Sequence, residues 1–420
     1  MTDARIEDLL RPLAPQVLGA LVRRYGRFDA AEDAAQEALL AAATQWPGDG
    51  LPDNPLAWLV TVASRRLTDL LRQEQARRRR EDALTTHIPP ADRVAPAADY
   101  GVEDADDTLI LLFMCCHPSL TGASQIALTL RALGGLTNAD VARALLVPED
   151  TVTRRITRAK QAIRESGLPF RMPSTAERAE RLAVVLRVLY LIFNEGYVST
   201  TGASLQRPDL SAEAIRLARL VHRLLPDDPE VAGLLALMLL TDARRAARSG
   251  SHGELVPMAE QDRSTWDRAE ISEGLELVSG AFDQGVAGPY LLQAAIAALH
   301  DESPTTQATD WARIEGLYEQ LATISDNPVV TLNHAVALAM ARGPAAGLEL
   351  LASVEGDRRV AEDHRLHAVR AHLLEMLGRH DAARLSYEAA ASRTGNLAQR
   401  RYLRARAVRL QTNADQPDPD

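Results

Sequence analysis

Helical periodicity is the property that most restricts what this 420-residue chain can fold into. Runs of alternating apolar and polar residues, which are typical of β-strands, are hard to find, whereas the helix-favouring residues alanine and leucine abound. Aromatic residues make up only 4% of the chain. The sequence therefore predicts an all-α protein, and its length is sufficient for two or three domains with substantial buried cores.

A basic amphipathic helix is predicted in the segment "PEDTVTRRITRAKQAIRESG", residues 148–167. Its apolar residues recur at steps of four, three and four, which places them in one stripe: Val152, Ile156, Ala159 and Ile163. The other side carries arginine, threonine and glutamine, with Lys160, the only lysine of the chain, at its edge. Such a helix packs on the protein with one side and offers hydrogen-bond donors to a partner with the other.

A shorter helix precedes the basic one and completes a helix-turn-helix pattern. The segment "TNADVARALLV" predicts a helix that Thr137 caps, and only "LVP" separates it from the basic helix. The basic helix would be roughly 27 Å long, enough for its N-terminal half to enter a DNA major groove. Glu149 and Asp150 either stabilise the N-terminus of this helix through its dipole or accept hydrogen bonds from cytosine.

The charge is unevenly distributed along the chain. Its net charge is -10, of which residues 172–420 contribute -8 and residues 1–171 only -2. Two segments are nevertheless basic: residues 61–80 carry seven arginines against two acids, and residues 150–171 carry six basic residues against two acids. This balance excludes indiscriminate nucleic-acid binding and leaves room for binding focused on two places.

The chain divides into helical parts and one acidic segment. Helices are predicted at 5–25, 30–45 and 56–80, and a turn over residues 47–55 precedes the last of them. Residues 81–107 contain eight acids and one arginine, which indicates a flexible linker. The predicted domains are 1–80, a linker at 81–107, a helix-turn-helix domain at 108–171, a helical domain at 172–410 and a disordered tail at 411–420.

Weak repeats occur in the C-terminal part. Ala383, Tyr387 and Ala390 follow Gly378 at the spacing of the second helix of a tetratricopeptide repeat, and Ala371 takes the small position of the first helix. One period upstream, Ala337 and Gly343 precede Ala371 and Gly378 by 34 and 35 residues. These spacings favour a helical solenoid over a plain helical bundle.

No arrangement of residues typical of catalysis is found, so we expect neither an enzyme nor a cofactor or metal site. The two cysteines, Cys115 and Cys116, are adjacent, which is not a zinc-binding spacing, and burial in a helix is preferred to a redox or metal role. In "FNEG", Gly196 is expected to end a helix, rather than Glu195 to act in catalysis. The sequence contains neither a signal-peptide core nor a membrane-spanning run, so a cytoplasmic protein without membrane contact is expected.

The order of the motifs resembles the extracytoplasmic function (ECF) sigma factors. Three segments carry the resemblance: "FDAAEDAAQEALLAAATQW", "NPLAWLVTVASRRLTDLLRQEQARR" and "LTNADVARALLVPEDTVTRRITRAKQAIRES". They lie within residues 5–171 and resemble sigma region 2 followed by sigma region 4. "LYLIFNEGYVSTTG" and the repeat-containing tail further resemble the group of these factors with a tetratricopeptide-like C-terminal extension.

The resemblance implies binding roles for three sets of residues. The set facing the β′ subunit of RNA polymerase would be Asp33, Gln36 and Glu37. The set contacting the minus-ten promoter element would be Asn54, Trp58, Arg65, Arg66 and Arg72, with Asn54 reading a flipped base and the arginines holding phosphates. Trp58 either stacks on the DNA or packs within the protein. The set reading the minus-thirty-five element would be Thr153, Arg154, Arg155, Thr157 and Arg158.

The implied function is that of an alternative sigma factor. It would bind the β′ and β subunits of the polymerase core, direct the enzyme to specific promoters and initiate transcription. The C-terminal domain would regulate this, either by folding back on the sigma regions or by binding a regulatory protein. The alternatives are a conventional helix-turn-helix transcriptional regulator with a helical interaction domain, and a solenoid scaffold.

Overall fold

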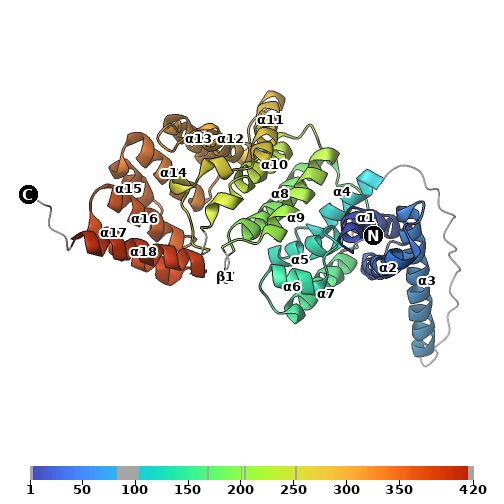
Figure 1. Ribbon diagram of the computed structural model, residues 1–420. Coiled ribbons are helices and arrows are strands. Elements are labelled where there is room, and N and C mark those ends of the chain that lie inside the picture. The colour runs from blue at the N-terminus through green and yellow to red at the C-terminus, as the bar shows by residue number, and fades with distance from the viewer. Residues whose placement is uncertain are drawn as a thin grey trace, which may run out of the picture. The chain divides into compact units, whose positions relative to one another are not determined.

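The structure, a computed structural model, describes residues 3–82, 104–167, 170–199, 201–202, 205–250 and 253–414. Within them the chain forms eighteen α-helices and two strands of two residues each, which confirms the predicted all-α class (Figure 1). The chain divides into two compact units, unit 1 (Met1–Leu189) and unit 2 (Tyr190–Asp420). None of the helices in the described part is both long enough and apolar enough to cross a membrane.

Unit 1 begins with three long helices that pack on one another. Alanines at the buried positions of the second helix let its neighbours approach closely, and leucines fill the inner face of the third, where Leu59 and Leu67 are fully buried. Four further helices and the first part of an eighth follow. The helices of unit 1 are α1 (Asp3–Tyr25), α2 (Phe28–Asp49), α3 (Pro55–Asp82), α4 (Asp104–Cys115), α5 (Gly122–Ala132), α6 (Asn138–Ala144), α7 (Glu149–Ser166) and α8 (Thr175–Tyr197).

Two predicted boundaries in unit 1 are wrong. The turn predicted at 47–55 is shorter, because α2 continues through Pro47 to Asp49. A proline this close to the end of a helix removes only one backbone hydrogen bond, so it does not stop the last turn. Residues 104–107, predicted as part of the linker, belong to α4, and the remainder of that linker at 83–103 lies outside the described residues.

The helix-turn-helix forms as the sequence predicts. The Thr137 hydroxyl accepts from the backbone N–H of Asp140, and the Asp140 carboxylate accepts from the N–H of Thr137, so a complete capping box begins α6. All four apolar residues of the predicted stripe on α7 are buried. In the turn between the two helices Leu146 has a φ of 51°, a left-handed conformation that side chains rarely adopt.

Unit 2 is an array of helices that follow one another in chain order (Figure 1). Each helix packs on its neighbours in sequence and buries a small apolar cluster with them. Three 3-10 turns, η1 (Arg245–Arg248), η2 (Met258–Glu260) and η3 (Arg263–Thr265), lie within the array. Its helices are α9 (Pro208–Leu224), α10 (Pro229–Asp242), α11 (Arg268–Gln284), α12 (Pro289–Glu302), α13 (Trp311–Ile324), α14 (Pro328–Arg342), α15 (Pro344–Ala352), α16 (His364–Met376), α17 (His380–Arg393) and α18 (Leu397–Ala414).

The predicted repeat residues lie where a repeat of helical pairs needs them. Ala371 of α16 and Ala383, Tyr387 and Ala390 of α17 are buried in one cluster. Gly378 has a φ of +72°, which allows the tight turn between the two helices. The structure therefore agrees with the solenoid-like pairing of α16 and α17.

The two ends of the array are joined, which the sequence did not predict. Strand β1 (Thr201–Gly202) pairs in parallel with β2 (Gly395–Asn396). The buried Asn396 side chain donates from Nδ2 to the Ser199 carbonyl at 2.9 Å. An extended segment near the start of the unit is thus held against the turn between its last two helices.

Gly196 has a different structural role from the predicted one. The helix does not end there, because α8 continues to Tyr197. A Cβ at position 196 would lie 2.3 Å from the backbone nitrogen of Ser211 in α9. The glycine therefore permits a close approach of α8 and α9, and the neighbouring Glu195 accepts a hydrogen bond from the Ser199 hydroxyl at 3.2 Å.

Gly196→Ala is expected to destabilise unit 2 by about 1–3 kcal/mol, because backbone atoms must shift to admit the methyl group. Gly280→Ala is the matched control: its Cβ, on an exposed position of α11, meets nothing within 4 Å. That change should stabilise the helix by about 0.5–1 kcal/mol. Thermal unfolding of both variants tests this, and equal melting temperatures would contradict the close-approach interpretation.

Candidate functional site

The residues predicted to face the polymerase share one side of α2. The side chains of Asp33 and Glu37 are 58% and 49% exposed, and Gln36 is half-buried. Leu40 lies on the same side, one turn beyond Gln36, and is 69% exposed. Leu40 is not among the predicted contacts, although its spacing of three and four residues from Glu37 and Gln36 places it there. An exposed leucine beside acid and amide groups suits a protein partner.

Two of these predicted residues are paired within unit 1. The ammonium nitrogen of Lys160, on α7, lies 2.8 Å from Oδ1 of Asp33. The guanidinium of Arg66, on α3, lies 3.5 Å from Oε2 of Glu37. The basic helix α7 therefore contacts α2 at a residue that the resemblance assigns to polymerase binding.

A buried ion cluster lies next to Asp33. The Glu32 side chain is only 1% exposed and forms ion pairs with two cations, Arg131 Nε of α5 at 2.7 Å and the Lys160 ammonium group. A third pair joins Arg164 of α7 to Asp29 at 3.2 Å. Burial alone would lower the pKa of Lys160, but Glu32 and Asp33 outweigh it and raise that pKa, so the lysine stays charged. Glu32 was missed because the alanines around it are the residues expected to be buried.

The residues predicted to contact the minus-ten element begin at the turn between α2 and α3. Asn54 accepts a hydrogen bond from the Ala57 N–H through Oδ1 at 3.0 Å, which makes it the cap of α3. Within the described part of the chain, its amide NH₂ group donates no hydrogen bond to another residue. Trp58 is half-buried and makes an edge-to-face contact with the buried Trp46, with ring centroids 5.4 Å apart. That contact favours the packing role of Trp58.

The three arginines of α3 that are predicted to contact DNA lie on its exposed side. Arg65, Arg66 and Arg72 are all exposed. Arg66 pairs with Glu37, and the Arg72 guanidinium lies 3.6 Å from Oδ1 of Asp69, one turn earlier in the same helix. Pairs this exposed are weak, so phosphates can compete for both guanidinium groups.

The outer side of α7 carries the residues predicted to read the minus-thirty-five element. Thr153, Arg154, Thr157 and Arg158 are exposed, and Arg155 is half-buried. None of these three arginines has an acidic ion-pair partner among the described residues. Thr153 accepts from Asn138 Nδ2 at 3.1 Å, which ties the start of α6 to α7. The buried stripe and the cationic surface thus occupy opposite sides of one helix.

The two cysteines lie in the interior of unit 1. Cys115 and Cys116 are fully buried, which confirms the preferred interpretation, and burial raises the pKa of Cys116 to about 12. Such a thiol stays protonated and unreactive. Within the described residues, no three His, Cys, Asp or Glu side chains are grouped as metal ligands.

Comparisons with known proteins agree with this geometry. Residues 9–77 match sigma-70 region 2, residues 110–163 match sigma-70 region 4, and residues 181–282 match a family of unknown function. The chain is 41% identical over 414 residues to an uncharacterized protein of Rhizobium meliloti (strain 1021), with 96% of each chain covered. No solved structure matches the chain.

Shorter relatives carry a functional name. The ECF RNA polymerase sigma factor SigK of Mycobacterium ulcerans (strain Agy99) is 29% identical over 151 residues, which cover 36% of this chain and 78% of that protein. SigK of Mycobacterium tuberculosis (strain H37Rv, ATCC 25618) is 34% identical over 118 residues, which cover 28% and 60% of the two chains. Both sigma regions, in this order, define an RNA polymerase sigma factor. The chain belongs to the ECF sigma factor family and carries a C-terminal extension after the two sigma regions.

Two substitutions at Asn54 separate its capping role from base reading. Asn54→Asp keeps an oxygen for the Ala57 N–H and removes the amide donor, so thermal stability should stay near wild type while promoter opening falls. Asn54→Ala removes the cap as well as the amide donor. Promoter opening should fall, and the free energy of unfolding should drop by about 1 kcal/mol. Permanganate reactivity of the minus-ten thymines measures opening. Full opening by Asn54→Asp would show that the amide donor reads no base.

Proposed function

We propose that this chain binds the core of RNA polymerase through the exposed side of α2 and directs the enzyme to specific promoters. The proposal rests on the different surfaces that the helices of unit 1 expose. α2 exposes acid and amide side chains, whereas α3 and α7 expose arginines. The matches to sigma regions 2 and 4 support it.

The minus-thirty-five element is the proposed target of α7. The helix has eighteen residues, which corresponds to a length of roughly 27 Å, so its N-terminal half can lie in the major groove. Arginine can bind both acceptors of guanine, and threonine can bond a base edge or contact the thymine methyl group. Arg154 donates to the Thr151 hydroxyl at 3.4 Å. Neither it nor Arg155 or Arg158 has an acidic partner among the described residues, so DNA can compete for their donors.

The minus-ten element is the proposed target of the α2–α3 turn and the exposed side of α3. Asn54 would hold an unstacked base through its amide, while Arg65, Arg66 and Arg72 neutralise phosphates. Binding of single-stranded bases offsets the few kcal/mol that unstacking costs. The protein would therefore act by positioning the polymerase and stabilising melted DNA, with no covalent step of its own.

A conventional helix-turn-helix regulator is the main alternative. Such a protein needs α5 to α7 and an effector domain, but it needs no polymerase-binding helix and no second DNA-binding helix. The match of residues 9–77 to sigma-70 region 2 favours the sigma factor.

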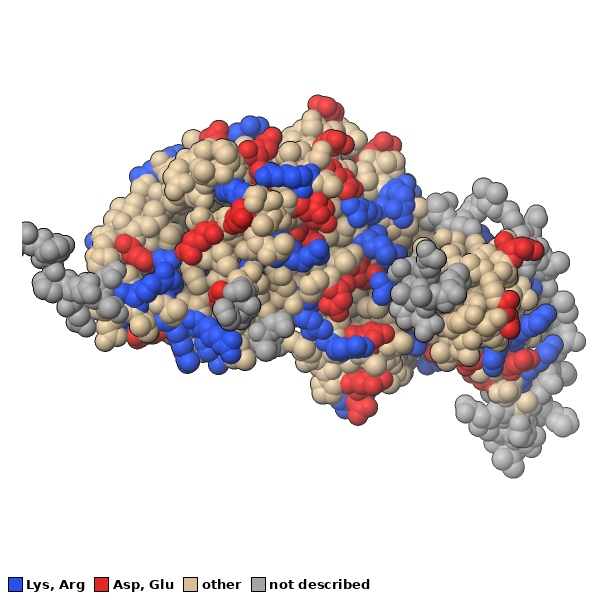
Figure 2. Space-filling view, in the orientation of Figure 1, with Lys and Arg blue, Asp and Glu red and all other residues tan. Residues whose placement is uncertain are grey.

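We extend the proposal to the C-terminal extension, which we assign to regulation through a protein partner. Its acidic charge and separate cores favour a role apart from DNA. On the face of unit 2 that Figure 2 shows, basic and acidic side chains are mixed, which suits a protein partner better than a nucleic acid.

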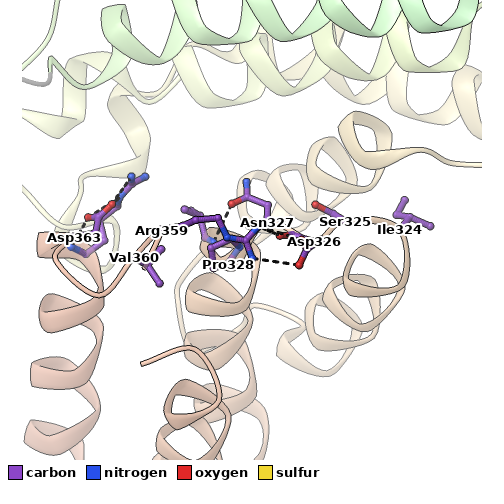
Figure 3. A pocket seen from close by; sticks show the side chains of 10 residues that line it. Ile324, Ser325, Asp326, Asn327, Pro328, Arg359, Val360 and Asp363 are labelled. Carbon is purple, nitrogen blue, oxygen red and sulfur yellow. Dashed lines mark hydrogen bonds and ion pairs between the residues drawn. The ribbon is translucent and has the colours of Figure 1, made fainter. Parts of the chain in front are cut away.

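A cavity of about 480 Å³ in unit 2 is one place where such a partner can bind. It lies between the turn before α14 and the segment before α16 (Figure 3). Arg359 lines this cavity. Its guanidinium donates to the Asp326 carbonyl at 2.7 Å and to Asp357 Oδ2 at 2.7 Å. Asn327 and Asp363, which cap α14 and α16, also line the cavity. The lining mixes charged and polar side chains with the apolar Ile324, Val329 and Val360, so a segment of a partner protein with both kinds of side chain suits it.

Run-off transcription with purified core polymerase tests the function. The full chain should start transcripts at defined promoters with no other sigma factor present, whereas a conventional regulator would give no transcript. A chain that ends after Leu189 keeps unit 1 whole and should start at the same promoters with a changed yield. An unchanged yield and an unchanged affinity for the core would remove the regulatory role from the extension.

Arg158→Ala should weaken promoter binding by about 1–3 kcal/mol and relax specificity at one position of the minus-thirty-five element, if the arginine reads a base. Arg154→Ala is expected to behave in the same way at another position. Arg143→Ala is the matched control, because Arg143 pairs with Asp140 in its own helix α6. Affinities for a set of promoter variants distinguish a base contact from a phosphate contact. If the substitution weakened binding to every variant equally, the arginine would be a phosphate contact.

A further inference from the structure

The hydroxyl groups of the two exposed threonines on α7 are bonded in opposite ways. Thr153 and Thr157 lie one turn apart on the outer side of the helix, where both are exposed. The Thr153 hydroxyl accepts a hydrogen bond from Nδ2 of Asn138, the first residue of α6, at 3.1 Å. The Thr157 hydroxyl instead donates to the Thr153 carbonyl at 2.8 Å. Within the protein, Thr153 therefore uses a lone pair, whereas Thr157 uses its proton.

The bond from Asn138 decides what the Thr153 hydroxyl can offer to DNA. A threonine hydroxyl has one proton and two lone pairs. Because the Asn138 amide donates to Oγ1, the proton of this hydroxyl points away from that amide and can be donated on the exposed side of α7. In the major groove the acceptors are N7 and O6 of guanine, N7 of adenine and O4 of thymine. Thr153 is thus suited to a base edge that accepts a hydrogen bond.

The bond to the backbone gives Thr157 a different chemistry. Its proton lies on the carbonyl four residues earlier, a bond that threonine commonly makes inside helices. With the oxygen turned toward its own helix, the methyl group is the branch of the side chain that faces outward. Thymine is the base that presents a methyl group in the major groove, and apolar contact with that group distinguishes it from the other bases. Thr157 is thus suited to thymine.

The positions of the two threonines allow each to reach a different base pair. They are the fifth and ninth residues of an eighteen-residue helix, so both lie in the N-terminal half, which enters the groove in a helix-turn-helix protein. Four residues of helix rise about 6 Å, close to the spacing of two base pairs at roughly 3.4 Å each. Two readers with different chemistry at this spacing can recognise two separate positions.

We propose that Thr153 and Thr157 read different features of the minus-thirty-five element: Thr153 donates a hydrogen bond to a base acceptor, and Thr157 contacts a thymine methyl group. Asn138 is a positioning residue, because its amide fixes the direction of the Thr153 hydroxyl. This inference rests on the proposed function, in which α7 lies in the major groove of that element. The bond between Asn138 and Thr153 does not depend on that function.

Serine and valine substitutions separate the two roles. Serine keeps the hydroxyl and lacks the methyl group, whereas valine keeps the shape and lacks the hydroxyl. Thr153→Val should reduce the preference for the favoured base at one position about fivefold, and Thr153→Ser should keep that preference. At the second threonine the order is reversed, because Thr157→Ser should reduce the preference at another position about fourfold and Thr157→Val should keep it.

The measurement is the affinity of the complex between the full chain and core polymerase for DNA. The complex first selects a minus-thirty-five sequence from random DNA, and its affinity for that sequence and for every single-base variant then gives the preference at each position. If serine and valine had the same effect at either threonine, or if their order were the same at both, the division of roles would be overturned.

Deoxyuridine tests the methyl contact directly, because it differs from thymidine only by the missing methyl group. Each thymine of the selected sequence is replaced in turn. One replacement should weaken binding by wild type and by Thr157→Val about fourfold and leave binding by Thr157→Ser unchanged. If no replacement weakened wild type, or if the same thymine still mattered to Thr157→Ser, the methyl contact would be overturned.

Asn138→Asp tests the positioning role. A carboxylate only accepts hydrogen bonds, so the Thr153 hydroxyl must donate to it and turn its proton away from DNA. This variant should lose the same base preference as Thr153→Val, and the double variant should lose no more than either single variant. If Asn138→Asp weakened binding to every sequence equally, it would act through its charge alone, and the positioning role would be overturned.

A measurement without DNA keeps the two levels of the proposal apart. Melting temperatures of Asn138→Ala, Thr153→Val and the double variant of the full chain form a double-mutant cycle. If the two side chains are bonded, the double variant should lose less than the sum of the two single losses, whereas additive losses would overturn the bond. If the complex selects no minus-thirty-five sequence at all, the proposed function of α7 fails, while the cycle still decides whether the bond exists.

Discussion

The buried carboxylate of Glu32 is the interaction on which the arrangement of unit 1 depends. An isolated charge in that position would cost several kcal/mol, so the fold must supply cations, and it supplies them from two helices of the second sigma region. That requirement brings α7, the helix proposed to read DNA, against the side of α2 that is proposed to bind the polymerase.

The helix α7 serves two purposes because its sides differ. Its apolar stripe holds it in the helix-turn-helix, and Arg154 and Arg158, which are proposed to bind DNA, are exposed. Lys160 and Arg164 lie between these sides and face the acidic residues of α2. Displacing α7 from α2 therefore breaks ion pairs without disturbing the packing that keeps α7 folded.

Patterns of neighbouring residues in the sequence predicted many helices of this structure. The features that they did not predict depend on contacts between residues far apart in the chain. The period of Val152, Ile156, Ala159 and Ile163 predicted α7 and its buried side, and the Thr137 cap followed from two neighbouring residues. Glu32 was not predicted, because nothing local indicates that an acid among alanines will meet Arg131 and Lys160, which lie about a hundred residues further along the chain. The pairing of β1 with β2 escaped for the same reason. The resemblance to sigma factors supplied the roles of Asp33 and Asn54, which periodicity alone cannot assign.

The distance between α2 and α7 is the measurement that tests the central claim most directly. Fluorescent labels at Gln45→Cys and Gln161→Cys, both exposed positions, report it, since Cys115 and Cys116 are buried. Energy transfer should show one short distance in the free chain and a long one, near the spacing of the promoter elements, in the complex with core polymerase and promoter DNA. A short distance that persists in a transcribing complex would contradict the account.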